Sequence, residues 1–328
     1  MRWREHVSGG EPDGPDGVEY HRLPTAGRSG PGWGVLAIVA AVVGFLVAQL
    51  VVATGFQVYY AVTGADVRDS FDALLDTDAL TPAGLAFVLL AITAAIPFMM
   101  VAYRLVIGLP VGWLMSVARR MRWRWLLVSL GVGVAALVFK IVLAAVVPAG
   151  DLSTTETTSA NDVTRTTVAF LVVIVLFVPL QAAAEEYVFR GLMLQGCGTL
   201  VANAVVSKVV AVVVPAVVFA LFHGSQSVPV FIDRLAFGVA AGILAIATGG
   251  LEAAIAFHVA NNWIAFLVTL FFGDITTALN PTGGDGWDVV VSVVSAAVFV
   301  LMAVGAARAM GLTTRAVRTE LVGPVARV

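Results

Sequence analysis

Long apolar runs, separated by short polar stretches, repeat along most of the chain. A helix that crosses about 30 Å of hydrocarbon needs about 20 predominantly apolar residues, which is close to the length of these runs. The first run is also far longer than the roughly 7–15 apolar residues of a cleavable signal peptide. The pattern predicts eight membrane-spanning helices, at about residues 33–62, 83–108, 126–148, 167–186, 208–223, 231–248, 251–272 and 288–310.

The polar stretches predict how these helices are oriented. Residues 1–32 are polar and rich in Gly and Pro, which predicts a disordered tail. The loop at 63–82 contains five aspartates and one arginine, whereas the loop around 119–124 contains four arginines and no acid. By the positive-inside rule the arginine loop faces the cytoplasm, the aspartate loop faces outward, and both chain ends are cytoplasmic.

Composition supports a membrane protein and excludes several other classes. The 328 residues are 59% hydrophobic and 12% charged, whereas a soluble domain has about 25% charged residues. The net charge of -2 provides no basic surface for nucleic acid, and the single cysteine, Cys197, is expected to be a buried thiol. We therefore expect an all-α polytopic bundle with a polar intramembrane cavity. Ala, Val and Gly dominate the chain, as they do in proteins of GC-rich bacterial genomes, so we expect it to lie in a bacterial plasma membrane.

Ionisable side chains inside a span cost several kcal/mol on insertion scales, so each one needs an explanation. Arg104 and Lys140 are single long cations, which we expect to extend toward a headgroup region. Asp233 and Arg234 are adjacent near a helix end and are expected to neutralise each other. These four residues are interpreted as structural.

A second set of polar residues in the spans has no such simple explanation. Its members are Glu185, Glu186, Arg190, His223, His258 and Asn262. Glu186 and Arg190 are four residues apart in the favoured order for a helical ion pair, while Glu185 points roughly 100° away. His258 and Asn262 share one helical face. Glu185 is therefore the carboxylate that this spacing leaves free for chemistry.

A free carboxylate, two histidines and an amide in a cavity of low dielectric can act as a hydrolase that activates water. A desolvated Glu can accept a proton from water, and His and Asn can donate hydrogen bonds to an oxyanion. The same residues can also serve as interhelical hydrogen bonds that hold a bundle together. Spacing alone does not decide between these interpretations.

Taken in order, the motifs EExxxR (185–190), FxxxH (219–223) and HxxxN (258–262) resemble those of the CAAX protease and bacteriocin-processing family. These are intramembrane proteases that include the type II CAAX prenyl endopeptidases. A glycine-rich helix, FGVAAGILAIATGG, precedes the last motif as it often does in the family. The resemblance covers about residues 167–270.

The resemblance implies a role for each motif residue. Glu185 would be the general base that activates water, assisted by His223. His258 and Asn262 would stabilise the tetrahedral oxyanion, and Glu186 and Arg190 would hold the site together. No cofactor is required in this interpretation. A divalent metal such as zinc stays an alternative, with Glu185, His223 and His258 as its ligands, although the chain has no HExxH motif.

These inferences divide the chain into four parts. Residues 1–32 are the tail, 33–166 the first three spans with their loops, 167–272 the catalytic core, and 273–328 the last span and C-terminal tail. The predicted function is an intramembrane endopeptidase that hydrolyses a membrane-proximal or prenylated peptide, so its partners are a peptide or lipidated protein and the lipid membrane.

Two other functions use the same polar residues without catalysis. One is a membrane transporter, and the other is a scaffold or a bacteriocin self-immunity protein. A transporter is expected to have repeated halves, which the chain does not show, and a silent scaffold would be free to lose motif positions that are all filled here. Proteolysis is therefore the preferred prediction.

One geometric difficulty accompanies this prediction. Simple alternation of the spans places His223 at the opposite membrane side from Glu185 and His258. The three side chains can meet only near mid-membrane, or if residues 187–207 form a short or re-entrant helix. The glycines of GLMLQGCG and a kink at Pro215 are the predicted sites of such irregularity.

Overall fold

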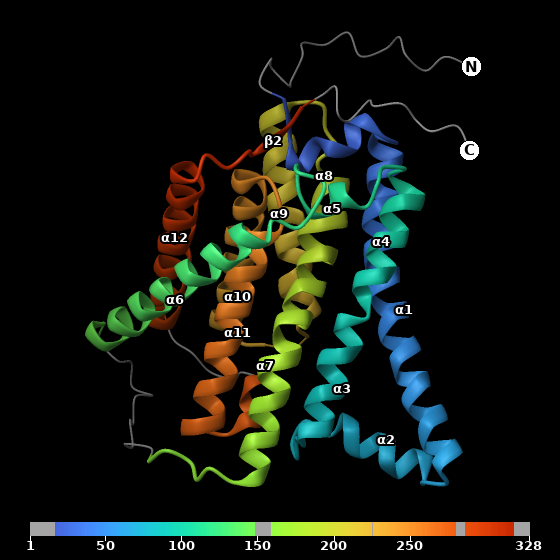
Figure 1. Cartoon of the computed structure of the whole chain (residues 1–328), viewed down its shortest axis with the longest axis vertical. Coiled ribbons are helices and arrows are strands. Elements are labelled where there is room, and N and C mark those ends of the chain that lie inside the picture. The colour runs from blue at the N-terminus through green and yellow to red at the C-terminus, as the bar shows by residue number, and fades with distance from the viewer. Residues whose placement is uncertain (1–16, 148–158, 225, 280–285, 318–328) are drawn as a thin grey trace.

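The computed structural model describes residues 17–147, 159–224, 226–279 and 286–317, which form a bundle of helices (Figure 1). Eight helices among these residues are long and apolar enough to cross a membrane, which confirms the predicted number and the all-α class. They are α1 (Pro31–Thr63), α3 and α4 (Pro82–Thr93 and Ala95–Val106, one span), α6 (Trp123–Val146), α7 with η2 and α8 (Arg165–Glu186, Tyr187–Met193 and Leu194–Cys197, one span), α9 (Ala204–Phe222), α10 (Val228–Thr248), α11 (Glu252–Phe272) and α12 (Gly286–Ala309).

Short elements connect the spans or cover their ends. They are β1 (Val18–Glu19), η1 (Tyr20–Ala26), α2 (Val67–Leu75), α5 (Gly112–Met115), η3 (Ile275–Ala278) and β2 (Arg315–Ala316). Polar side chains cap the N-termini of several helices by accepting a hydrogen bond from a backbone N–H of the first turn. Asp66, Thr81 and Asn203 do so for α2, α3 and α9. Thr164 and Thr167 form a reciprocal capping box at the start of α7.

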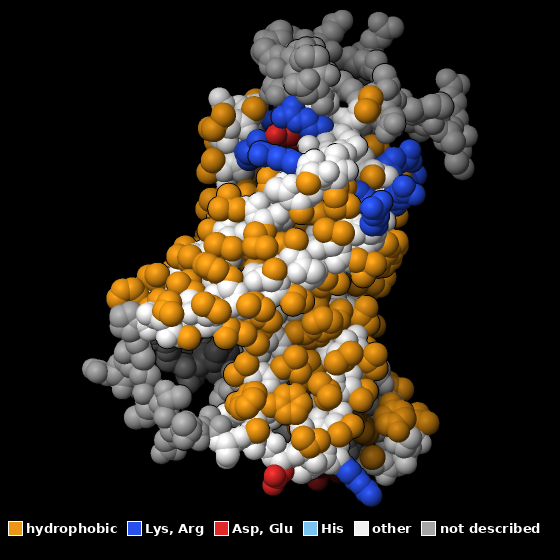
Figure 2. All heavy atoms as spheres, turned by 60° about the vertical axis from the view of Figure 1, so that its left-hand side comes forward, with side chains coloured by type: hydrophobic (Ala, Val, Ile, Leu, Met, Phe, Trp, Pro, Cys, Tyr) orange, Lys and Arg blue, Asp and Glu red, His pale blue; other side chains and the backbone are white. Residues whose placement is uncertain are grey.

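The surface shows the polarity expected of a membrane protein. Hydrophobic side chains cover the middle of the face shown in Figure 2, and the charged side chains visible there gather toward its two ends. Many large apolar residues of the spans are exposed, among them Leu50 at 66%. Because exposure of this kind is unfavourable in water, the outer surface is suited to lipid.

The fourth span differs from its prediction. We predicted that it ends at 186, but the helix continues through a π-helical segment, η2, and ends at Cys197. The prediction failed because it took the polar Glu185–Arg190 segment as a membrane boundary, whereas these side chains are buried inside the bundle. The helix therefore needs no break where its residues become polar.

The glycines of GLMLQGCG allow close packing and do not break the helix within the motif. A Cβ atom on Gly196 would lie 2.8 Å from the Cβ of Ala37 in α1, and one on Gly198 would lie 2.0 Å from the backbone oxygen of His21. Only residues without a side chain permit these contacts. The helix therefore ends where α1 and η1 approach it closely, and Cys197 is a buried free thiol as predicted.

The predicted tail of residues 1–32 is ordered over the part that the structure describes. β1 pairs with β2 in an antiparallel ladder, and Tyr20 and Leu23 are fully buried. The Glu19 carboxylate lies 2.9 Å from the Lys208 Nζ and 3.2 Å from the Arg315 guanidinium. Apolar burial and these ion pairs explain why this polar, glycine-rich segment folds, while residues 1–16 lie outside the described part.

The β1–β2 pairing places the start and end of the described chain at the same end of the bundle (Figure 1). The arginine loop also lies there, because Arg122 forms a 2.7 Å salt bridge with Glu252 and donates to the backbone oxygen of Thr313 at 3.0 Å. The aspartate-rich loop with α2 lies at the opposite end. This arrangement agrees with an even number of spans, although the charge pattern alone indicates which end faces the cytoplasm.

A histidine under the β1–β2 ladder should make this end sensitive to acid. His21 is fully buried, and burial lowers its pKa from 6.5 to about 4; the nearby Lys208 and Arg22 charges lower it as well, and Glu19 at 3.7 Å opposes the shift. The folded segment thus favours the neutral ring, while the opened segment binds a proton below pH 6.5. The contribution of His21 to the stability of the folded segment is therefore complete above pH 6.5. Between pH 6.5 and pH 4 the equilibrium constant for opening rises about tenfold for each unit by which the pH drops.

The buried thiol of Cys197 is a native reporter for this opening, since α8 contacts η1. A disulfide reagent that reacts in acid, such as 4,4′-dithiodipyridine, should label Cys197 faster at pH 4.5 than at pH 6.5. We expect His21→Leu to remove most of that increase. An equal acid-induced increase in His21→Leu would assign the opening to another group.

Candidate active site

Two adjacent glutamates and an arginine lie in the interior of the fourth span. The residues Glu185, Glu186 and Arg190 are 7%, 0% and 0% exposed. Their helix has 33 residues, so the glutamates are well away from both of its ends. Charged groups buried in this way persist only when partners compensate them.

The Glu186 carboxylate has two such partners. Its Oε1 accepts a hydrogen bond from Arg190 Nη1 at 2.9 Å and lies 2.7 Å from His258 Nδ1. The structure thus brings together the i,i+4 pair that the sequence predicted and adds a histidine from α11. Glu186 is held from two sides and has little freedom to act as a proton acceptor.

His258 also reaches the second glutamate. Its Nε2 lies 3.4 Å from Glu185 Oε2, so the ring stands between the two carboxylates with one nitrogen toward each. Because carboxylates accept, the short contact to Glu186 assigns a proton to Nδ1. The Nε2 atom then faces Glu185, whose Oε2 has no hydrogen-bond partner among the described residues.

His223 lies at the exposed side of this cluster, directly after α9. Its Nδ1 lies 2.8 Å from the backbone oxygen of Phe219. A carbonyl oxygen can only accept, so Nδ1 carries the proton and the neutral ring presents Nε2 as an acceptor. Glu185 is close enough to interact with His223 electrostatically.

The lengths of the helices explain how His223 reaches the depth of Glu185. Glu185 precedes the end of its helix at Cys197 by about 18 Å, and His223 follows the start of α9 by about 28 Å. The chain therefore returns past the depth of Glu185 in a helix of 19 residues, α9, which continues through Pro215 and ends at exposed positions. The predicted re-entrant segment is not needed, because the preceding 33-residue helix already extends beyond the site.

The FxxxH motif also contributes an aromatic surface. The Phe219 ring centroid lies 5.9 Å from that of His258, and the Arg190 guanidinium lies 4.6 Å from the Phe219 centroid. Phe237 of α10 is 5.7 Å from the same guanidinium and 4.9 Å from His258. These rings exclude water from Arg190, so its positive charge interacts with the Glu186 carboxylate and with the π faces of the rings.

Asn262 has a partner that sequence analysis missed. Its Nδ2 donates to Gln181 Oε1 at 3.1 Å, and Gln181 is 5% exposed on α7. Gln181 precedes Glu185 by one helical turn, so the two side chains share a face. The four-residue spacing between Gln181 and Glu185 was the signal in the sequence that could have identified Gln181 as part of the site.

The site does not fit a metal ion well. No group of three His, Cys, Asp or Glu side chains within the described ranges has an arrangement that could hold a metal. The predicted ligand set of Glu185, His223 and His258 does not form such a group in this part of the chain. We therefore derive no step through a metal.

The fold and this cluster define an integral membrane protein with a buried glutamate–histidine site. Residues 165–264 match the family model described as type II CAAX prenyl endopeptidase Rce1-like, which confirms the resemblance for that segment and is consistent with a peptidase. All six candidate residues fall inside it. No curated protein and no solved structure matches the chain.

Proposed function

We propose that this protein is an intramembrane endopeptidase that hydrolyses a peptide bond in a membrane-proximal or prenylated substrate. The observation that carries the proposal is the placement of Glu185. Its carboxylate is buried beside His258 and interacts with His223, while its neighbour Glu186 is occupied by Arg190 and His258. A buried carboxylate of this kind is a suitable proton acceptor for water.

The proposed reaction needs no covalent enzyme intermediate. Glu185 accepts a proton from water, and the hydroxide attacks the scissile carbonyl carbon to form a tetrahedral oxyanion. The Asn262 amide donates a hydrogen bond to the oxyanion. His258 donates a second one from Nε2 in the doubly protonated form of its ring, in which Nδ1–H stays on Glu186. As the carbon–nitrogen bond breaks, Glu185 returns its proton to the leaving amine.

The proposal includes a supporting role for His223. Its Nε2 acceptor lies on the exposed side of Glu185, where it can accept a hydrogen bond from the attacking water and orient it.

We further propose that the arginine loop and both chain ends face the cytoplasm of a bacterial plasma membrane, which the separation of arginines and aspartates supports.

The test is cleavage by the purified full-length protein in detergent or nanodiscs. Reporter peptides carry either a prenylated cysteine near the C-terminus or a membrane-proximal sequence, and mass spectrometry identifies the bond cut. Cleavage of at least one peptide at a defined bond is the expected result. Absence of cleavage in both sets, with folded protein, would contradict the proposal and favour the transporter or self-immunity alternative.

Removing the amide of Asn262 should slow catalysis without unfolding the protein. We expect Asn262→Ala to lower kcat by about 10²–10³-fold, the usual effect of losing one oxyanion donor. Gln181→Leu, which removes the acceptor that orients this amide, should lower kcat by a smaller factor. Gln49→Ala is the matched control, because that amide bonds to Phe45 in its own helix, α1.

Unchanged turnover in Asn262→Ala would remove the amide from the mechanism. A rise in KM alone, with constant kcat, would assign Asn262 to substrate binding.

A further inference from the structure

An arginine of α10, Arg234, lies at the exposed side of the glutamate–histidine site. It precedes Phe237 by three residues, so the two side chains share a helical face, and the Phe237 ring lies 4.9 Å from that of His258. Arg234 is close enough to interact electrostatically with both His223 and Glu185. Arg234 is half-buried, whereas Glu185 is 7% exposed, so the arginine borders the open side of the site.

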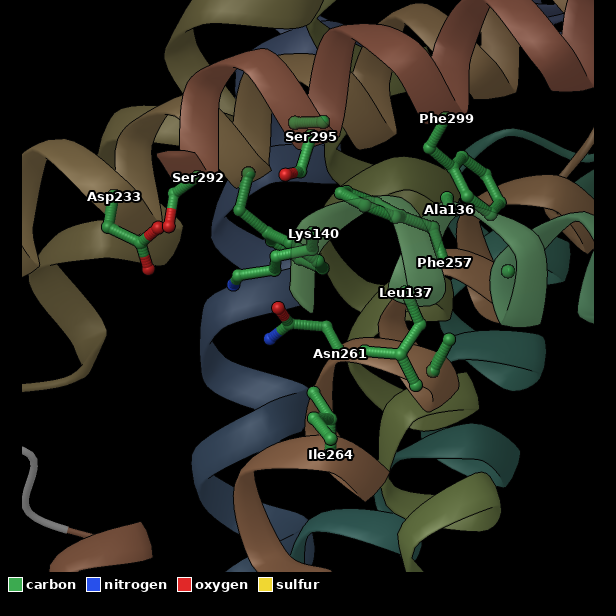
Figure 3. A pocket seen from close by; sticks show the side chains of 14 residues that line it. Ala136, Leu137, Lys140, Asp233, Phe257, Asn261, Ile264, Ser292, Ser295 and Phe299 are labelled. Atoms are coloured by element: carbon green, nitrogen blue, oxygen red, sulfur yellow. The ribbon is translucent and has the colours of Figure 1, made fainter. Parts of the chain in front are cut away.

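The acid next to this arginine does not neutralise it by direct contact. Asp233 lines a separate pocket between α6, α10, α11 and α12, and Figure 3 shows it there with Lys140, which we expected to extend toward a headgroup. We also expected Asp233 and Arg234 to neutralise each other. Their charges do interact, but within the described chain no ion pair shorter than 4 Å joins them, because adjacent residues of a helix point in different directions.

A glutamine holds the guanidinium of Arg234 in place and leaves its charge intact. Arg234 Nη1 donates to Gln226 Oε1 at 2.6 Å, and Gln226 Nε2 donates to the backbone oxygen of Ala220 at 2.7 Å. The preceding backbone oxygen, that of Phe219, bonds to His223. The last carbonyls of a helix have no N–H partner within it, and here two side chains occupy successive ones at the end of α9. Arg234 is therefore anchored to the same helical turn as His223.

Most of the hydrogen-bonding capacity of Arg234 is left over. A guanidinium has five N–H donors, and in the described structure only the one toward Gln226 has a partner. Glu185 does not take the others, because it forms no ion pair with Arg234 within 4 Å and its Oε2 has no hydrogen-bond partner among the described residues. A cation inside a span is costly unless an anion compensates it. The remaining donors therefore fit a carboxylate that arrives with the ligand of this site.

We propose that Arg234 binds an acidic side chain of the substrate, an Asp or a Glu close to the scissile bond. The inference rests on the proposed endopeptidase function and names a substrate class for it. The planar guanidinium can hold a carboxylate through two parallel hydrogen bonds, so Arg234 is a specificity-determining residue, and Gln226 positions it.

Exchanging charges between protein and peptide tests this assignment. The reporter peptides carry Glu, Gln or Lys in turn at each of the three residues on either side of the cut bond, and they end in a C-terminal amide so that no terminal carboxylate competes. With the full-length protein in nanodiscs, we expect kcat/KM at one position to be about tenfold higher for Glu than for Gln. This is the low end for a charge-assisted hydrogen bond, because Glu185 opposes a second carboxylate. The gain should lie mainly in KM.

Arg234→Glu should reverse the preference at that position, so that the Lys peptide is cut faster than the Glu peptide. Gln226→Glu is an independent variant that keeps Arg234 but pairs it with an acid, and it should abolish the preference. The matched control is Arg104→Glu, because Arg104 also lies in the last turn of a helix and donates to a backbone oxygen, that of Gly108 at 3.1 Å. A reversal in the control, or an equal loss for all peptides in Arg234→Glu, would overturn the proposal.

Cleavage and binding together separate this inference from the proposed function. If Glu and Gln peptides are cut with equal kcat/KM at all six positions, the function stands and the inference fails. If nothing is cut, but fluorescent Glu peptides bind more tightly than Gln peptides in a way that depends on Arg234, the inference stands as a peptide-binding site and the proposed function fails. An Arg234-dependent preference for a free C-terminus over the amide, with no preference for Glu, would assign the cation to the peptide end and overturn the proposal.

Discussion

Glutamine in place of Glu185 should lower the rate of peptide cleavage by about 10²–10⁴-fold, the usual contribution of a general base. The substitution keeps the size of the side chain and its contact with His258, but the amide cannot accept a proton from water. Assays quenched at set times with the reporter peptides, analysed by mass spectrometry, measure the loss of cleavage rate. The melting temperature should stay near that of the unaltered protein, because Glu185 has no ion pair as short as that of Glu186.

The adjacent position provides the control for this result. Glu186→Gln should destabilise the protein, because it leaves the Arg190 guanidinium buried without an anion at 2.9 Å. Two neighbouring glutamates therefore have separable effects, one on turnover and one on folding. Full activity in Glu185→Gln would refute the mechanism, and equal losses of stability in both variants would show that the roles are not separated.

Replacing Arg190 by methionine should lower the free energy of unfolding by about 3–5 kcal/mol, the range for breaking a buried ion pair. Methionine fills similar space beside Phe219 and Phe237 but leaves the fully buried Glu186 with His258 as its remaining partner. Arg190→Lys should be intermediate, since it keeps the charge and loses the planar contact with the rings. Chemical unfolding in detergent, followed by tryptophan fluorescence, measures the loss.

Arg68 is a matched control, because it also pairs with an acid four residues away. Its 3.8 Å contact with Asp72 is at the surface, where Arg68 is 89% exposed, so Arg68→Met should cost at most about 1 kcal/mol. Equal stability losses in the two variants would show that burial of the Glu186–Arg190 pair is unimportant.

Hydropathy and helical spacing predicted the parts of this protein that depend on local sequence. Apolar runs indicated all eight spans, because lipid imposes a minimum length on each helix. The i,i+4 spacing of Glu186 and Arg190 predicted their contact, because an α-helix places such residues on one face.

Features that depend on tertiary packing were missed. Hydropathy treats a polar residue as a sign of the membrane surface, so it ended the fourth span at Glu186, although neighbouring helices bury that residue. The partnership of His258 with both glutamates, and of Asn262 with Gln181, joins residues of α7 and α11 that are far apart in sequence. Spacing within one helix carries no information about such contacts.

The ladder between β1 and β2 has a consequence for the order in which the protein assembles. The contact between Glu19 and Arg315 joins residues 296 positions apart, so β1 cannot pair until nearly the whole described chain has been synthesised. At about 5–20 residues per second that interval is about 15–60 s. His21 and Leu23 must wait for this partner while the spans insert, and closure of the ladder is therefore a late event that marks a completed bundle.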